Sequence, residues 1–127
     1  MGCVCLRKGD ISFDFQTGNN TLIEFTHIHD GVITDIEPSF DIIYGVYDMS
    51  SGARIMDGSY RAGGRITRHA IGVYYFQLSH EDTENLVGTY KLEVTFIDRN
   101  DRNAVKVAHA NQLIYMTFEP RQNNDLI

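Results

Sequence analysis

Apolar and polar residues alternate with a period of two along most of this chain, which is the pattern of β-strands that turn one face toward a core. Two runs show it most clearly, with apolar side chains at Phe40, Ile42, Tyr44 and Val46 in the first and at Tyr90, Leu92, Val94 and Phe96 in the second. Because side chains two residues apart lie on the same face of a strand, we expect these two sets to face the core together.

Similar runs are separated by turns rich in Gly, Asn and Asp at roughly ten-residue spacing. We expect strands within residues 11–16, 21–29, 32–37, 40–48, 53–60, 65–78, 88–98 and 104–118. The 65–78 segment reads as one long strand or as two strands broken at 69–72, and the pattern predicts a bulge or bend near Asn111. No segment has a sustained helical period. About eight strands with this spacing predict an all-β fold, an antiparallel β-sandwich.

The strand that begins at Gly88 opens with Gly-Thr-Tyr directly after an acidic loop, residues 80–86. An earlier strand opens in the same way at Gly72. In immunoglobulin-like sandwiches, a tyrosine at the start of a late strand turns its hydroxyl back onto the preceding loop and holds a corner there. We therefore expect an immunoglobulin-like sandwich in which Gly88 and Tyr90 form a structural corner, with the Tyr90 hydroxyl bonded to backbone within residues 81–86.

Composition narrows the possible partners. The chain has 127 residues, enough for one domain with a core of its own. Its net charge of −6 and its scattered basic residues argue against a phosphate-binding surface, so we expect no nucleic-acid partner. No apolar run approaches the ~20 residues of a membrane span, and no signal-peptide segment is present. We therefore expect no membrane partner and synthesis in a cytosol.

The pattern divides the chain into an amino-terminal arm at 1–9, the β-sandwich domain at 10–120 and a polar tail at 121–127. The arm contains a short apolar run that is a candidate interface: Cys3, Val4, Cys5 and Leu6. This run either pairs as a first strand or packs on a neighbouring subunit. Its two cysteines are too close for an unstrained bridge and have no distant partner, so we expect free thiols.

Nothing in the sequence indicates an enzyme. Its serines lack the Gly-x-Ser-x-Gly elbow and neither cysteine has a catalytic context, so we expect no catalytic residue and no cofactor. His27 and His29 have a spacing that zinc and copper sites use. The candidates for a third ligand are His69, His80 and His109, and no pattern brings them together. Scattered histidines in a β-protein are more often surface or strand-end residues, and we expect no metal site.

Between Phe40 and Phe96 the motifs follow in a recognisable order. An apolar strand reading Ile-Ile-Tyr-Gly-Val-Tyr-Asp is followed by Ser-Gly, Gly-Ser-Tyr, Gly-Val-Tyr-Tyr-Phe and, after a polar loop, Gly-Thr-Tyr. This order resembles the small immunoglobulin-like domains of tailed-bacteriophage structural proteins, such as capsid decoration, neck, tail or baseplate components. The resemblance implies a non-enzymatic assembly subunit of a virion, built in the host cytoplasm. Its partners would be other structural proteins of the same particle, and it would form a homo-oligomer or part of a larger assembly.

For such a subunit we expect residues 1–9 to dock on another subunit and residues 104–118 to help form the interface. Two other functions stay open at this point. A carbohydrate- or protein-binding sandwich module would use aromatic side chains, and the candidates are Tyr44, Tyr47, Tyr60, Tyr74 and Tyr75. A lipid-anchored cytosolic adaptor would use an acylation signal at Gly2 and the nearby cysteines, although Leu6 stands where Ser or Thr is usual.

Overall fold

The computed structural model describes residues 11–100, 106–107 and 114–120, which form an all-β sandwich with one short helix. The larger sheet has the strand order β1-β11-β9-β5-β6, with β10 beside β9. Its strands are β1 (Ile11–Gln16), β5 (Phe40–Asp48), β6 (Arg54–Ser59), β9 (Gly88–Asp98), β10 (Lys106–Val107) and β11 (Ile114–Glu119).

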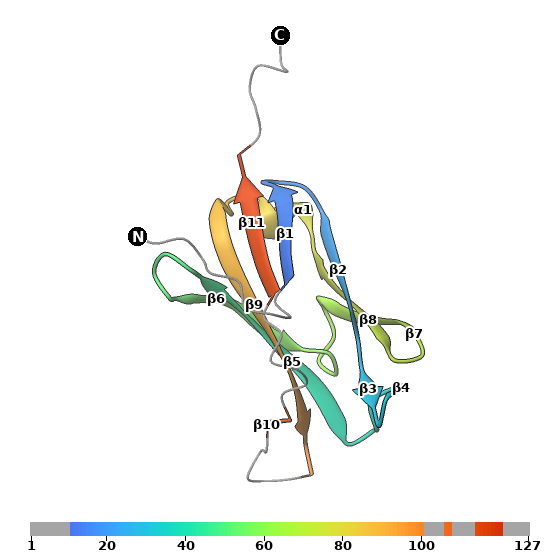
Figure 1. The fold of residues 1–127 in the computed structure, drawn as a ribbon. Helices are drawn as coiled ribbons and strands as arrows, with labels where there is room; N and C mark the ends of the chain where they lie inside the picture. Colours follow the sequence, from blue (N-terminus) through green and yellow to red (C-terminus); the bar gives the residue numbers. More distant parts are fainter. Residues whose placement is uncertain (1–10, 101–105, 108–113, 121–127) are drawn as a thin grey trace.

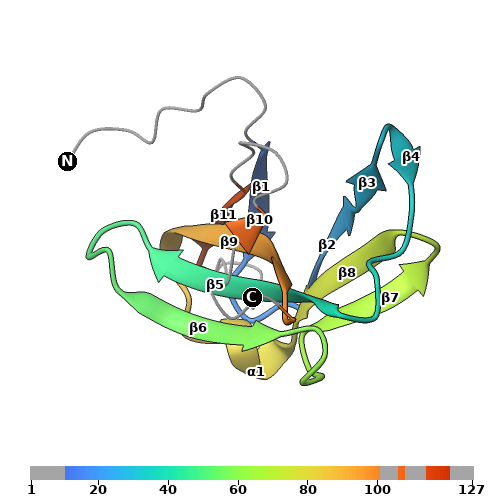
Figure 2. The ribbon, with the colours of Figure 1, turned by 90° about the horizontal axis from the view of Figure 1, so that it is seen from below.

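The smaller sheet has the order β2-β8-β7, and a separate hairpin is formed by β3 and β4. The bounds are β2 (Thr21–Thr26), β3 (Ile28–His29), β4 (Val32–Ile33), β7 (Ile66–Ala70) and β8 (Val73–Leu78). Figure 2 shows β7 and β8 on one side of the molecule and β6 and β9 on the other. The two sheets therefore form the two layers of the sandwich.

The prediction of an all-β sandwich with antiparallel sheets is confirmed, with one difference in the larger sheet. There β9 pairs antiparallel with both β5 and β11, but β1 pairs parallel with β11. The chain leaves β1 for β2 in the smaller sheet, so β1 forms no hairpin and its neighbour comes from much later in the chain. Phe15 packs against Phe118 with ring centroids 5.4 Å apart, which places β1 and β11 over the same core.

The core lies between the sheets, and the side chains predicted to face it do so. Those that are buried or half-buried in this cluster are Phe40, Ile42, Tyr44, Val46, Leu92, Val94 and Phe96. The antiparallel register of β5 and β9 sets Ile42 opposite Phe96 and Val46 opposite Leu92. Across the sandwich, the ring centroid of Tyr44 lies 5.0 Å from that of Phe76 on β8. The alternation thus predicted correctly which faces of the two central strands form the core.

Two predicted segments are divided in the structure. Residues 65–78 form two strands, β7 and β8, that turn at Gly72, so the broken reading of this segment is correct. The strand expected at 21–29 is interrupted after β2, and its end pairs with part of 32–37 as the β3–β4 hairpin. The bend expected near Asn111 lies outside the described residues.

Residues 80–86, expected as a loop, begin with one helical turn, α1 (His80–Thr83). Ser79 and Asp82 form a capping box at its start, in which the side chain of each accepts a hydrogen bond from the backbone N–H of the other. Ser-x-x-Asp is close to the usual Ser/Thr-x-x-Glu/Gln signal, so the sequence did contain a start signal for this turn.

Strands β8 and β9 run between two opposite ends of the sandwich (Figure 1). The hairpin end contains the β3–β4 hairpin and the turn between β7 and β8. The helix end contains α1 and the turn between β1 and β2, where the Gly18 N–H donates to the carbonyl oxygen of Thr83 at 3.2 Å. Strand β9 has 11 residues. Strand β8, which connects the β7–β8 turn directly to α1, has six residues and spans roughly 20 Å at about 3.3 Å per residue.

Candidate docking surface

Large apolar side chains are exposed together at the hairpin end. On the β3–β4 hairpin and the adjoining turn, the exposed fractions are 47% for Ile28, 61% for Val32, 50% for Ile33 and 65% for Ile71. We call these four residues the apolar tip. Ile28 and Ile33, which are paired, lie on one face of the hairpin and Val32 lies on the other. Several exposed aliphatic side chains at one end of a domain are typical of a surface that another molecule covers.

The hairpin depends on Asp30 and Gly31, which both have positive φ, 51° and 76°. Two such residues are what a type I′ turn requires, and the twist of this turn matches the twist of the flanking strands. Asp-Gly is a preferred sequence for it. The turn pairs Ile28 with Ile33, so these two members of the apolar tip are presented in a defined register.

The hairpin is held against the turn between β7 and β8 at Gly72. A Cβ atom at this position would lie 2.6 Å from Ile33 Cγ2 and 2.8 Å from the backbone nitrogen of Thr34, and φ is +68°. Glycine is the residue that allows this approach without strain. The His27 N–H donates to the carbonyl oxygen of Gly72 at 2.8 Å, and the Gly72 N–H donates to Asp35 Oδ1 at 2.7 Å. These contacts therefore hold Ile71, in the turn between β7 and β8, close to the three members of the apolar tip on the β3–β4 hairpin.

Asp35 also connects this contact to the smaller sheet. Its Oδ1 accepts a hydrogen bond from Arg68 Nε on β7 at 3.0 Å. The hydrogen bonds from Arg68 and from the Gly72 backbone lower the pKa of Asp35. Asp35 is therefore ionised at neutral pH, where its charge strengthens both contacts.

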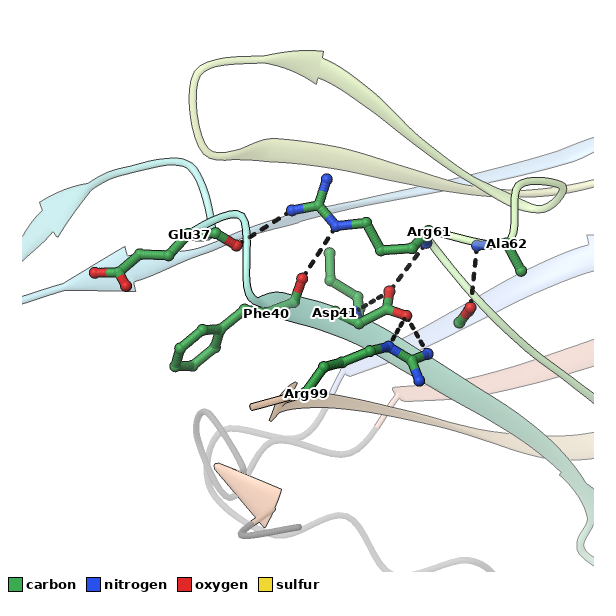
Figure 3. A network of polar contacts seen from close by, with 8 residues as sticks. Glu37, Phe40, Asp41, Arg61, Ala62 and Arg99 are labelled. Atoms are coloured by element: carbon green, nitrogen blue, oxygen red, sulfur yellow. Dashed lines mark hydrogen bonds and ion pairs between the residues drawn. The ribbon is translucent and has the colours of Figure 1, made fainter. Parts of the chain in front are cut away.

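A second carboxylate, Asp41, is fully buried at the start of β5 and joins three segments (Figure 3). Its Oδ1 accepts from the backbone N–H groups of Ile42 at 2.7 Å and Arg61 at 2.9 Å. Its Oδ2 accepts from Arg99 Nε at 2.8 Å and also from Arg99 Nη2. Burial opposes ionisation of Asp41, but the hydrogen bonds from Arg61 and Arg99 outweigh it, so the pKa of Asp41 is lowered.

The side chain of Arg61 holds the connection between β4 and β5. Its Nε donates to the carbonyl oxygen of Phe40 at 3.0 Å, and its Nη2 donates to that of Glu37 at 3.2 Å (Figure 3). The guanidinium carbon also lies 5.1 Å from the ring centroid of Tyr60. These contacts fix the chain that leads from the hairpin into the larger sheet.

Arg61 and Arg68 line a small pocket of about 220 Å³, which we call the arginine pocket. The other side chains in its wall include Asp35, Pro38 and Tyr60. Two guanidinium groups and one carboxylate line it, so the pocket favours an anionic group. The pocket adjoins the apolar tip, because Asp35 follows the β3–β4 hairpin in sequence and accepts a hydrogen bond from Gly72 in the turn between β7 and β8. The hairpin end therefore has an apolar part and a basic part on one rigid framework.

The predicted corner residues Gly88 and Tyr90 lie at the helix end, away from this surface. The Tyr90 hydroxyl donates to the carbonyl oxygen of Val87 at 3.1 Å and accepts from the Val87 N–H at 3.3 Å. The expected partner lay within residues 81–86, so the observed partner is one residue later. Gly88, with φ of +101°, provides the backbone conformation that leads from Val87 into β9.

The other candidate site residues are not brought into one place. The proposed interface of the arm lies outside the described residues: Cys3, Val4, Cys5 and Leu6. Of the five candidate tyrosines, Tyr44 and Tyr74 are buried and Tyr60 packs against the core. Tyr47 on β5 and Tyr75 on β8 are half-buried and belong to different sheets. These five rings do not form a single aromatic platform.

His27 and His29 have different environments. His27 is buried with Nδ1 2.7 Å from the carbonyl oxygen of Thr34, whereas His29 is exposed with Nε2 3.4 Å from Asp30 Oδ2. Among the described residues, no group of three or more His, Cys, Asp or Glu side chains is placed to hold a metal ion. The same part of the chain contains no helix that is long and apolar enough to cross a membrane.

Neither the known protein families nor the curated proteins include a match to this chain. Any inference of function therefore rests on the fold and on the surface described above.

The sequence pattern gave no role to the residues that shape this surface. Arg61 and Arg68 belong to the densest group of basic residues in the chain, which is a local signal that pointed to this surface. The pairing of Arg68 with Asp35 spans 33 positions and that of Arg99 with Asp41 spans 58. No periodic pattern reports contacts at such separations.

Proposed function

We propose that this protein is a non-enzymatic structural subunit of a tailed-bacteriophage virion, a capsid decoration, neck or tail component that acts through protein–protein contacts. The observation that carries the proposal is the apolar tip, in which aliphatic side chains are 47% to 65% exposed. A partner that covers them removes apolar surface from water. Because the hairpin end is already held in one conformation, little conformational entropy is lost on binding.

The strand order supports an immunoglobulin-like domain of the kind to which the sequence is similar. In these sandwiches one sheet contains strands B, E and D and the other contains G, F and C, and variable-type domains add strands beside C. Taken in chain order as B, C, C′, D, E, F and G, the strands β2, β5, β6, β7, β8, β9 and β11 have this arrangement. The Tyr90 hydroxyl bonds at the start of β9 are consistent with the corner of such domains.

The alternative functions have less support. A carbohydrate-binding module that uses the five tyrosines would need rings that reach solvent together, whereas Tyr44 and Tyr74 are 5% and 1% exposed. A lipid-anchored adaptor depends on residues outside the described ranges, and the intact mass of the protein purified from its natural source would reveal acyl chains. A mass increase of that kind would favour the adaptor.

Composition analysis of purified particles tests the proposal directly. If the chain is a virion component, particles of the phage whose genome encodes it contain the protein at a fixed stoichiometry, measurable by quantitative mass spectrometry. Particles that are pure, infectious and free of this protein would contradict a structural role in the virion.

The role of the apolar tip is tested by adding full-length protein to particles that lack it. Ile71→Asp should weaken binding by about tenfold or more, because burying one aliphatic side chain contributes about 1.5–3 kcal/mol. Leu22→Asp is the matched control, since Leu22 is 46% exposed but lies on β2. Equal binding by the two variants, each with an unchanged melting curve, would show that the tip is not the contact.

A further inference from the structure

The helix end has an exposed surface whose charge is opposite to that of the arginine pocket. Val87 there is 56% exposed and directly precedes Gly88, which pairs with Phe118, and the residue after Phe118, Glu119, is also exposed. Glu81 and Glu84 are also exposed, on α1 and directly after it. We call Glu81, Glu84, Val87 and Glu119 the acidic surface. It combines one apolar side chain with three carboxylates.

Within the described part of the chain, the ion-pair contact of these carboxylates is the 3.9 Å from His80 Nε2 to Glu84 Oε2, between two exposed side chains. The arginine near α1 is Arg65, and its guanidinium is already bound to Asp82, with Nη2 to Oδ1 at 2.7 Å and Nε to Oδ2 at 3.2 Å. Among the described residues, no Lys or Arg forms an ion pair with Glu81, Glu84 or Glu119. A partner with guanidinium groups would complement them.

At the hairpin end, the two guanidinium groups of the arginine pocket have nitrogen atoms that form no hydrogen bond within the described residues. Arg68 gives its Nε to Asp35, and within the described residues no acceptor contacts its two terminal nitrogens. Arg61 gives Nε and Nη2 to carbonyl oxygens, which leaves Nη1. The Glu37 carboxylate points away from Arg61 (Figure 3). The pocket can therefore accept a carboxylate from another molecule beside the apolar tip.

We propose that the partner of the hairpin end is a second copy of this chain, bound through its acidic surface. In this contact Val87 of one copy packs among the aliphatic side chains of the apolar tip of the next. The Glu84 carboxylate of the first copy enters the arginine pocket of the second and forms an ion pair with the Arg68 guanidinium. The inference rests on the proposed function, because it names the partner of the same apolar tip.

The two surfaces differ and lie at opposite ends of the sandwich, so the contact is head to tail. Such heterologous contacts repeat, and they give a closed ring or an open filament. The chain has a net charge of −6, so copies repel one another in most orientations. With the arginine pocket against the acidic surface, opposite charges meet, and each copy then covers both of its exposed ends.

Charge reversal of each surface in the full-length chain tests this contact. By sedimentation velocity, the wild type should form oligomers as its concentration rises, whereas Arg68→Glu alone and Glu84→Arg alone should remain monomeric over the same range. Mixing the two variants should restore assembly, because each reversed surface then meets an opposite charge on the other variant. Arg54→Glu and Glu24→Arg are exposed control reversals on β6 and β2, and they should assemble as the wild type does.

Each other outcome overturns the head-to-tail contact. If the mixture stays monomeric while both variants keep the melting curve of the wild type, the two surfaces do not bind each other. If Arg68→Glu is unstable, Arg68→Gln takes its place, and assembly equal to that of the wild type would exclude the arginine pocket. A wild-type chain that is monomeric at every concentration removes the second copy as partner. The proposed function would still stand if Ile71→Asp reduced binding to particles, so the two ideas fail separately.

Discussion

The core that packs against β5 and β9 and the surface of the hairpin end are held together by different interactions. In the core, Ile42 and Val46 are 0% exposed and contact other apolar side chains, a kind of contact that has no required direction. At the hairpin end, Asp35 and Asp41 accept directed hydrogen bonds from segments that are distant in sequence. Repeated apolar positions therefore build the core, whereas the rigid surface loops of the hairpin end depend on a few singly placed carboxylates and glycines.

The largest effect should come from putting a charge into the core. Val46→Asp buries a carboxylate with no partner, which costs several kcal/mol, comparable with the total stability of about 5–15 kcal/mol of a domain. We expect the variant not to fold, as measured by circular dichroism and by the absence of a cooperative melt. Glu93→Lys on the outer face of β9 is the control and should fold. A soluble Val46→Asp protein with a cooperative melt would contradict the observed packing of the core.

The sequence predicted the first of these two regions and missed the second. The positions of Ile42, Val46, Leu92 and Phe96 follow from period-two alternation, which is a local property of each strand. It did not predict the parallel pairing of β1 with β11, because direction depends on how the chain returns to the sheet. At the hairpin end, the local signals were the Asp-Gly turn of residues 30–31 and the group of basic residues that contains Arg61 and Arg68. Its carboxylate contacts join segments that no local pattern relates.

An intermediate effect should come from weakening the hairpin end while leaving the core intact. Asp41→Asn keeps the shape of the side chain but removes the charge that Arg99 and two backbone N–H groups stabilise. Hydrogen bonds to a charged group contribute about 1.5–3 kcal/mol, so we expect a loss of that order in the free energy of unfolding. Urea denaturation measures the loss, and hydrogen exchange at the amides of Ile42 and Arg61 should accelerate most.

The loss should also depend on pH, because the pKa of Asp41 is lowered from 3.8 in the folded protein. A lowered pKa contributes stability that is complete above the unfolded value and disappears as pH falls through the folded value. The difference between the wild type and Asp41→Asn should therefore be full at pH 7 and should shrink below about pH 4. A difference that is constant from pH 7 to pH 3 would contradict an ionised Asp41 as the source of the effect.

The smallest effect should come from the corner at the helix end, where Tyr90 combines both kinds of interaction. Its ring is buried beside Phe118, with centroids 5.9 Å apart, while its hydroxyl holds the Val87 backbone. Tyr90→Phe keeps the ring and removes the hydroxyl, so we expect the free energy of unfolding to fall by about 1 kcal/mol. Hydrogen exchange should accelerate at Val87 and stay unchanged at Gly72, since the two ends share no polar contact among the described residues. An unchanged unfolding midpoint would mean that the ring alone holds the corner, which would make the helix end resemble the core rather than the hairpin end.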